Sequence, residues 1–166
     1  MTKGGARRAE GSRRGDGMRI AVVVSRFNQP ITERLRDGAV AELERCGVDP
    51  QSVVEVWVPG AFELPLAAHR LATSGEVEAV VCLGAVVKGD TDHYTHVATQ
   101  CAWGLQRVQL DTGVPCVFGV LTTETQAQAE DRAGGAAGNK GEEAAATAVE
   151  MADVLRQLPK SGPGGS

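Results

Sequence analysis

The chain has 166 residues, of which 42% are hydrophobic, 23% are charged and only 4% are aromatic. This composition indicates one globular domain with an aliphatic core. The formal net charge of −4 at pH 7 argues against a nucleic-acid-binding function, and no apolar run reaches the roughly 18 residues that a membrane span needs.

The first 17 residues differ in composition from the rest of the chain. They carry five Lys or Arg residues and two acids, a balance of +3, which leaves −7 for the remainder. Almost nothing in residues 1–17 is apolar, so we expect this basic segment to be disordered. No hydrophobic run follows the charges, so a signal peptide is not expected. We expect one domain at residues 18–158 and a flexible tail at 159–166.

The first half of the chain alternates predicted strands and helices. Residues 19–24 and 53–58 are β-branched runs that predict strands. Between them, apolar residues recur every four positions over residues 31–43, which predicts a helix. A proline and a glycine end the second strand, and residues 61–72 predict the second helix.

The third predicted strand leads into a dense cluster of polar residues. Residues 80–83 are apolar, as expected of a strand buried on both faces, and we expect the strand to end at Gly84. Residues 84–91 combine glycines with charged side chains, and two of the three histidines, His93 and His96, follow. The cluster predicts a functional site, unless it is simply the polar start of a helix.

One strand and three helices complete the predicted pattern. Residues 93–110 predict a helix, and residues 116–121 predict the fourth strand. A further helix is expected to begin near Thr125, which can cap it. A glycine-rich break at residues 134–138 separates it from a last helix at residues 139–158.

Strands that alternate with helices predict right-handed crossovers and a parallel sheet. The expected fold is therefore α/β, a three-layer α/β/α sandwich with a central four-stranded parallel sheet and helices on both faces. In such sheets, ligands bind outside the carboxyl ends of the strands. Four loops should meet there, at residues 25–28, 58–63, 84–93 and 122–125.

The cysteines form no CxxC pair and fall inside predicted helices and strands. They are Cys46, Cys82, Cys101 and Cys116. We expect them to be reduced core residues of a cytoplasmic protein.

The loop before the third helix contains Gly89, Asp90 and Thr91. Their backbone N–H groups, with the positive end of the helix behind them, would form a site for an anion such as phosphate. The alternative is an ordinary turn in which Asp or Thr caps the helix. The glycine spacing matches neither the Walker nor the dinucleotide-binding pattern.

His93 would lie in the first turn of that helix, where the positive helix end keeps an imidazole able to accept a proton near neutral pH. It is therefore a candidate general acid or base. His96 lies one turn further, and Asp90 and Asp92 are close in sequence. A metal site shared by these side chains, as in a metal-dependent hydrolase, is the alternative.

Candidate residues also occur on the other loops. Phe27 could stack on a flat heterocycle or cover the core. Glu63 could cap the second helix or accept hydrogen bonds from a polyol. Arg132 and Lys140 flank the glycine-rich break, where a guanidinium could clamp a phosphate or simply be solvated.

Five motifs of the chain resemble, in the same order, those of the lumazine synthase family, the 6,7-dimethyl-8-ribityllumazine synthases. The resemblance covers residues 18–158. The motifs are RFN at 26–28, VPGAFE at 58–63, GAVVKGDT at 84–91 followed by His93, FGVLTT at 118–123, and RAG at 132–134 with GNKG at 138–141.

The resemblance implies a flavodoxin-like fold and a transferase of riboflavin biosynthesis. Such an enzyme condenses 5-amino-6-(D-ribitylamino)uracil with 3,4-dihydroxy-2-butanone 4-phosphate, and releases 6,7-dimethyl-8-ribityllumazine, phosphate and water. An amine attacks the ketone, the imine loses phosphate, and a second amine closes the ring. Neither a metal nor an organic cofactor is implied.

The resemblance also implies the site residues by motif match. Residues expected to bind the pyrimidine and its ribityl chain are Phe27, Asn28, Ala61, Phe62, Glu63, Val86, Val87, Phe118 and Lys140. Those expected to bind phosphate are Gly89, Asp90, Thr91 and Arg132. His93 is the expected proton shuttle. Phe118, Lys140 and Arg132 are expected to reach the site from a neighbouring subunit.

The implied partners are small-molecule substrates, inorganic phosphate at the phosphate site, and further copies of the chain. Family members form homopentamers, and some close into icosahedral shells of sixty subunits, with active sites between neighbouring subunits. The short turn at residues 132–139 resembles the shell-forming members. Neither nucleic acid nor a membrane is an expected partner.

Two residues depart from the family's pattern. Asp92 stands where the family often has proline, and His96 stands where it often has an aromatic residue. They leave two alternatives, a lumazine- or flavin-binding shell protein with weakened turnover, or a paralogue that acts on a related aminopyrimidine. Steady-state formation of the fluorescent lumazine would distinguish turnover from binding alone.

Overall fold

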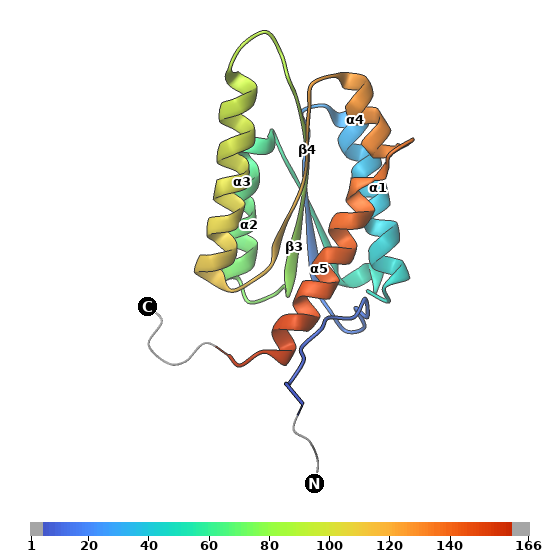
Figure 1. The fold of residues 1–166 in the computed structure, drawn as a ribbon, viewed down its shortest axis with the longest axis vertical. Helices are drawn as coiled ribbons and strands as arrows, with labels where there is room; N and C mark the ends of the chain where they lie inside the picture. The colour runs from blue at the N-terminus through green and yellow to red at the C-terminus, as the bar shows by residue number, and fades with distance from the viewer. Residues whose placement is uncertain (1–4, 161–166) are drawn as a thin grey trace.

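Four parallel strands form the central sheet of the computed structural model, which describes residues 5–160. β1 (Ile20–Ser25) and β3 (Ala79–Val87) are the inner strands, and β2 (Val53–Val58) and β4 (Cys116–Thr123) are the edges, in the order β2-β1-β3-β4. The predicted four-stranded parallel sheet is confirmed (Figure 1).

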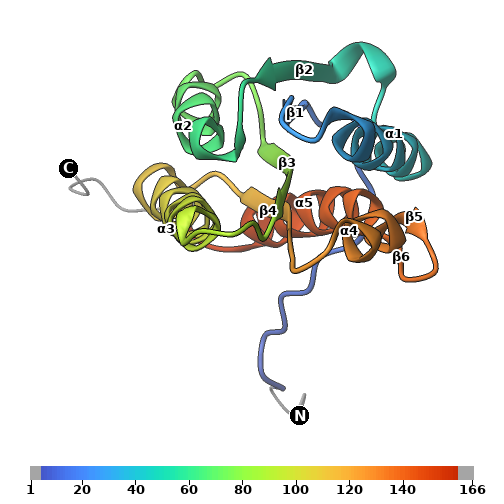
Figure 2. The same ribbon diagram turned by 90° about the horizontal axis from the view of Figure 1, so that it is seen from above.

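Helices cover both faces of the sheet, which confirms the predicted three-layer sandwich (Figures 1 and 2). α1 (Gln29–Arg45) and α5 (Lys140–Gln157) pack on one face, and α2 (Leu64–Thr73) and α3 (His93–Thr112) pack on the other. Alternate side chains of β1 enter the two cores, because successive residues of a strand point to opposite faces. Both cores are built mainly from Val, Leu and Ala.

The predicted end of β3 at Gly84 is wrong, because the strand continues to Val87. Residues 84–87 pair with residues 120–123 of β4. A Cβ on Gly84 would lie 3.0 Å from Ser25 Oγ and 3.4 Å from Leu64 Cδ1. Glycine therefore serves close packing inside the strand here, rather than ending it.

The chain between β4 and α5 contains one confirmed prediction and one missed element. α4 (Gln126–Arg132) begins as predicted, with Thr125 and Gln128 forming a capping box. The glycine-rich break is not a plain loop but a small antiparallel hairpin, β5 (Ala133–Gly135) and β6 (Gly138–Asn139).

Two short 3₁₀ turns, η1 (Pro50–Ser52) and η2 (Ala61–Glu63), precede β2 and α2.

The four cysteines are free and buried, as predicted. Burial raises the pKa of the Cys82 thiol well above its usual range and raises the pKa of Cys101 and Cys116 to about 12. These thiols are therefore protonated core residues.

Within residues 5–160, no helix combines the length and apolar character needed to cross a bilayer.

The N-terminal segment, for which we expect disorder, contacts α5 over part of its length. Ser12 donates its backbone N–H to Asp153 Oδ2 at 2.7 Å. Glu10 and Gln157 exchange two hydrogen bonds, the shorter being 2.7 Å from Gln157 Nε2 to the Glu10 carbonyl. Polar contacts of this kind leave no apolar pattern in a sequence, so composition alone does not reveal them. The expectations for residues 1–4 and 161–166 lie outside the described residues.

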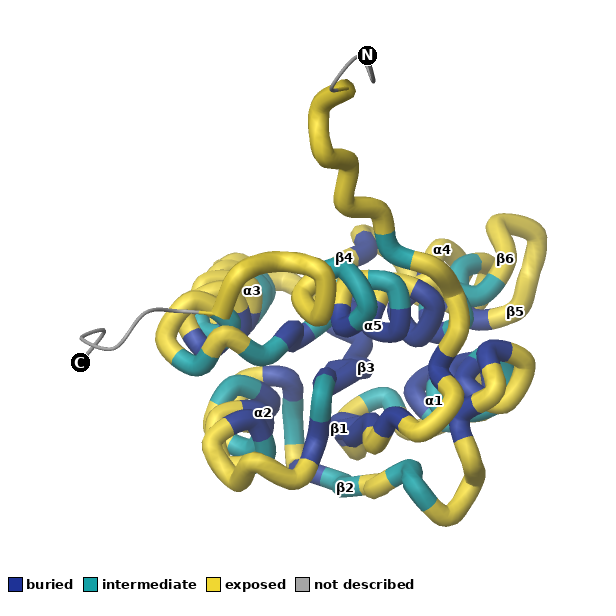
Figure 3. The backbone as a smooth tube through the Cα atoms, turned by 90° about the horizontal axis from the view of Figure 1, so that it is seen from below, coloured by how far each residue is buried: buried dark blue, intermediate teal, exposed yellow. Residues whose placement is uncertain are grey.

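Figure 3 shows how burial is distributed along the backbone. β1, most of β3 and β4, and the inner sides of the helices are buried, whereas the edge strand β2 is only partly buried, and most of the N-terminal segment and of the β3–α3 loop is exposed. The β3–α3 loop lies at the carboxyl ends of the strands, at the opposite pole from the N-terminal segment (Figure 1). The fold thus exposes the polar cluster that the sequence singles out.

Candidate functional site

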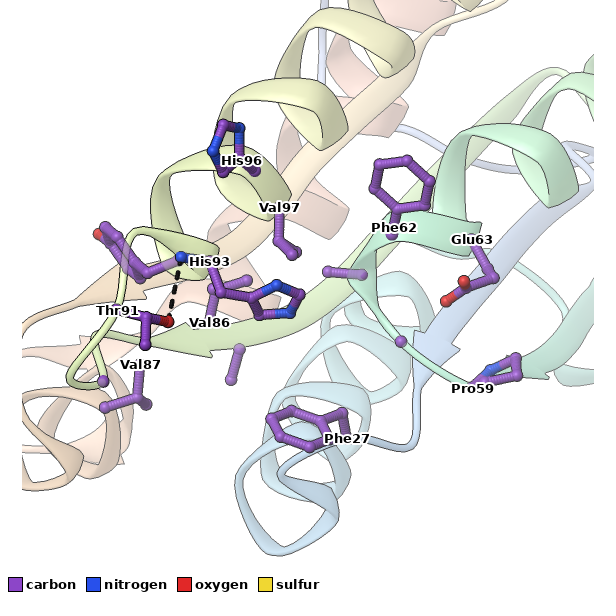
Figure 4. Close-up of a pocket in the computed structure, with 15 residues that line it drawn as sticks. Phe27, Pro59, Phe62, Glu63, Val86, Val87, Thr91, His93, His96 and Val97 are labelled. Atoms are coloured by element: carbon purple, nitrogen blue, oxygen red, sulfur yellow. Dashed lines mark hydrogen bonds between the residues drawn. The ribbon is translucent and has the colours of Figure 1, made fainter.

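A cleft of about 630 Å³ opens where β1, β2 and β3 end (Figure 4). Loops after these three strands and the first turns of α3 enclose it, at the place predicted for a parallel sheet. Its lining residues are Phe27, Pro59, Gly60, Ala61, Phe62, Glu63, Ala85, Val86, Val87, Gly89, Thr91, His93, Tyr94, His96 and Val97. We call it the main cleft.

Aromatic and aliphatic side chains form most of its wall. Phe27 and Phe62 are 69% and 60% exposed, although phenylalanine is usually buried. The chain has only three phenylalanines, so exposing two of them at one cleft is notable. Val86 and Val87 continue β3 along the floor. Flat apolar surfaces with a few polar groups between them suit a heterocyclic ligand.

His93 is the first residue of α3, and its imidazole points toward the open space between Phe27 and Glu63 (Figure 4). Its backbone N–H donates to Thr91 Oγ1 at 3.3 Å. The ring is exposed, and among residues 5–160 it makes no side-chain hydrogen bond or ion pair. It is therefore available to exchange protons with a bound molecule.

The β3–α3 loop contributes Gly89 and Thr91 to the cleft, but not Asp90. The backbone N–H of Lys88 donates to the Thr123 carbonyl at 2.9 Å, which ties the loop to β4. A Cβ on Gly89 would meet no atom within 4 Å. The space beside this backbone is open to an incoming anion.

Asn28, for which we expect a role in positioning the pyrimidine, is not among the residues that line the main cleft. It adopts a left-handed backbone conformation (φ 60°, ψ 44°) before α1, and its Nδ2 donates to the Ala85 carbonyl at 2.9 Å. Asparagine tolerates this conformation better than most residues. The contact ties the β1–α1 loop to β3 and so fixes the backbone next to Phe27.

Three predicted site residues lie in a different hollow, of about 430 Å³, formed by β4, α4 and α5. They are Phe118, Arg132 and Lys140. Arg132 Nη1 donates to the Gln128 carbonyl at 3.0 Å, and Lys140 Nζ pairs with Glu143 Oε2 at 2.8 Å. We call this the second hollow. Nine predicted site residues thus meet in the main cleft, three in the second hollow, and Asn28 and Asp90 in neither.

The sequence prediction missed several lining residues of the main cleft. They are Pro59, Gly60, Ala85, Tyr94 and Val97. Pro59 and Gly60 lie inside a motif that the resemblance includes, and Val97 shares one face of α3 with His93, four residues before it. Helical spacing from His93 was the available signal for Val97, but not for Tyr94, which is the next residue along the helix.

The alternative of a metal centre finds no geometric support. Among the residues that the structure describes, no group of three or more His, Cys, Asp or Glu side chains could hold a metal ion. His93 and His96 both line the main cleft, but Asp90 and Asp92 do not.

A family model and three curated relatives all match this chain under the same family name. The family model for 6,7-dimethyl-8-ribityllumazine synthase matches residues 17–156. A 6,7-dimethyl-8-ribityllumazine synthase of Protochlamydia amoebophila is 51% identical over 140 residues, covering 84% of this chain and 81% of that protein. The enzymes of that name from two Thermus thermophilus strains are 51% identical over 144 residues, covering 87% of this chain and 92% of theirs.

Proposed function

The chain belongs to the 6,7-dimethyl-8-ribityllumazine synthase family, and we propose that its main cleft works together with the second hollow of a neighbouring copy. It is a transferase of riboflavin biosynthesis. It condenses 5-amino-6-(D-ribitylamino)uracil with 3,4-dihydroxy-2-butanone 4-phosphate to 6,7-dimethyl-8-ribityllumazine, and releases phosphate and water.

The observation that carries the proposal is the division of the expected site residues. Phe27 and His93 line the main cleft, whereas Phe118, Arg132 and Lys140 line the second hollow across the sheet edge at β4. Within residues 5–160, no Arg or Lys lines the main cleft, so a cation that neutralises a bound phosphate would have to come from elsewhere, and Arg132 is the residue we assign to it. A homo-oligomer, with sites between subunits, would bring the two groups together. The pentamer of the family, alone or within a sixty-subunit shell, is the assembly we infer.

In this arrangement each group has a defined task. Phe27 stacks on the pyrimidine, and Glu63, with the backbone of Ala61 and Phe62, holds the ribityl chain. At the floor of the cleft, β3 presents the backbone of Val86 and Val87, which contacts the edge of the heterocycle. Phe118 and Lys140 of the neighbouring copy close the pyrimidine side.

The phosphorylated substrate binds at the other end of the cleft. Backbone N–H groups at residues 89–91 and the start of α3 stabilise the phosphate, and Arg132 of the neighbouring copy adds a charge-assisted contact. The amine of the first substrate then attacks the ketone, and His93 moves the protons that imine formation and phosphate loss require. Holding two reactive partners in one cleft accounts for much of the rate.

Mixing two inactive variants tests the shared site. Phe27→Ala damages the main cleft, and Arg132→Ala damages the second hollow, so each variant alone should form little fluorescent product. When the two are coexpressed, about one quarter of the sites in a randomly mixed ring combine an intact cleft with an intact hollow. Activity near that fraction is expected. Mixed assemblies as inactive as the single variants would refute the proposal.

The buried free thiols bear on location as well. Four free cysteines without a disulfide are typical of a reducing compartment. This supports the proposal that the protein is cytoplasmic.

A further inference from the structure

The chain between α4 and α5 turns back on itself between two cations. Arg132 is the last residue of α4, Lys140 is the first residue of α5, and both line the second hollow. Backbone pairing of Ala133 with Asn139 in the β5–β6 hairpin brings the two helix ends together. We call residues 132–141 the corner. Whatever holds the corner sets the separation and direction of the two cations.

One side chain in the corner makes three hydrogen bonds. Asn139 Oδ1 accepts from the backbone N–H of Gly141 at 2.8 Å and of Glu142 at 3.4 Å, which caps α5. Asn139 Nδ2 donates to the Arg34 carbonyl of α1 at 3.0 Å. One end of the amide therefore caps the helix that carries Lys140, and the other end ties that helix to α1.

Two glycines leave room for this contact. A Cβ on Gly38 of α1 would lie 2.5 Å from Asn139 Cγ. A Cβ on Gly141 would overlap the carbonyl oxygen of Leu35. Because neither position accepts a side chain, the Asn139 amide is confined between α1 and α5.

Arg34 contacts α4, just before the corner, and Asn139 inside it. Its carbonyl accepts the Asn139 hydrogen bond, and its Nη2 donates to the Glu130 carbonyl in the last turn of α4 at 3.5 Å. α1 thus contacts the helix that ends at Arg132 and the helix that begins at Lys140. A loss of the Asn139 tether would leave Lys140 and Arg132 without a common support.

We propose that Asn139 is a positioning residue, which fixes Arg132 and Lys140 in the direction in which they meet the substrates. The inference rests on the proposed function, in which both cations act in a neighbouring copy. Asn139 itself touches neither substrate. Its effect is transmitted through the hydrogen bond to Arg34 and through the cap of α5.

Two substitutions separate the tether from the cap. Asn139→Asp and Asn139→Ser both keep an oxygen that can cap α5, but neither keeps the Nδ2 donor to the Arg34 carbonyl. The ionised aspartate has no hydrogen to donate, and the serine hydroxyl ends closer to the backbone than Asn139 Nδ2 does. For both, we expect KM to rise roughly tenfold for 3,4-dihydroxy-2-butanone 4-phosphate, which Arg132 meets, and for the pyrimidine substrate, which Lys140 meets, while kcat stays within about twofold. The aspartate adds a negative charge and the serine does not. A rise in KM for the aspartate alone would be an effect of charge and would overturn the proposal.

The matched control removes a cap at the other end of the sheet. Asp49 accepts from the Gln51 N–H at 2.9 Å and caps η1, far from both hollows. Asp49→Ala should lower the midpoint of thermal unfolding, as we also expect of the Asn139 variants. Unlike them, it should leave both kcat and KM unchanged. If it raised KM to the same extent, Asn139 would have only a structural role.

Arg132→Ala and Lys140→Ala, measured in parallel, distinguish this inference from the proposed function. If the Arg132 and Lys140 variants raise KM for the substrate that each residue meets, and the Asn139 variants do not, the positioning role is wrong and the proposed function stands. If neither cation variant changes KM, the proposed function fails, and the inference fails with it.

Discussion

At the carboxyl ends of the strands Phe27, Phe62 and His93 are exposed, whereas at the amino ends Met18 and Ile20 are fully buried. Two glycines show the same difference. A Cβ on Gly89, at the carboxyl end, would meet nothing within 4 Å, and a Cβ on Gly15, at the amino end, would lie 2.5 Å from Val48 Cγ2. Open space marks the end at which we propose that substrates bind, and close packing marks the end that stabilises the fold. Substitutions at the two ends should therefore affect different measurements.

The largest effect is expected from Arg132→Ala at the carboxyl end. Loss of the charge-assisted contact should raise KM for the phosphorylated substrate roughly a hundredfold, because such contacts contribute about 3 kcal/mol. Steady-state kinetics with the pyrimidine substrate held at saturation and the phosphorylated substrate varied would measure it. Arg107→Ala, which removes an exposed ion pair to Asp111 on α3, is the control and should change nothing. An unchanged KM in Arg132→Ala would contradict the assignment.

His93→Ala should lower kcat about tenfold to a hundredfold without abolishing turnover. Imine formation is intrinsically easy, and the cleft still holds both substrates together. Single-turnover formation of the fluorescent product would separate the chemical step from binding. His69→Ala, on the exposed side of α2, serves as the matched control. Complete loss of turnover in a folded His93→Ala protein would show that positioning contributes less than we infer.

The paired substitutions Gly15→Ala and Gly89→Ala test the comparison directly. Gly15→Ala should destabilise the protein by about 1–3 kcal/mol through overpacking against Val48. Its kinetic constants should match those of the unmodified protein. Gly89→Ala should leave stability nearly unchanged and weaken phosphate binding several-fold, because the new methyl group occupies ligand space. Urea unfolding and inhibition by inorganic phosphate are the two measurements, and equal effects of both substitutions on either would remove the distinction.

The smallest effect concerns the docked N-terminal segment and depends on pH. The backbone N–H of Ser12, followed by its hydroxyl, lowers the pKa of Asp153 below its ordinary value of 3.8. Because the folded-state pKa is depressed, this contribution to docking is present above about pH 4 and is lost as the pH falls through the folded-state value. The protection of the Ser12 amide against hydrogen exchange, measured relative to the exchange rate of an unstructured peptide at the same pH, should fall in that range. Asp153→Asn should show weaker protection at neutral pH and no such transition.

The sequence predicted the strands well wherever β-branched runs are bounded by turn residues. Residues 53–58 were predicted and are found as β2. The end of β3 was wrong because a glycine can serve packing within a strand as well as ending one, and only the neighbours of Gly84 decide which. The β5–β6 hairpin was missed because two and three residues are too few to carry a periodic pattern.

The candidate site also has a part that the residue pattern predicts and a part that it does not. His93, Phe27 and the glycine loop were predicted because polar or aromatic residues follow predicted strands, and the structure places them around the main cleft. The separation of Phe118, Arg132 and Lys140 from the main cleft was implied only by the family resemblance. The residue pattern alone could not give it, since it depends on which edge β4 occupies in the sheet. The same holds for Asn28, whose hydrogen bond to Ala85 depends on the neighbouring strand.

The buried thiols have a practical consequence for work on the assembly. Maleimides and related reagents react with thiolates, and burial keeps Cys82, Cys101 and Cys116 protonated and out of reach. Cys46 is only 6% exposed, and burial is also the main cause of its raised pKa. A single cysteine introduced on the outside could therefore carry a fluorophore or cross-linker at a chosen place, without prior removal of the native ones.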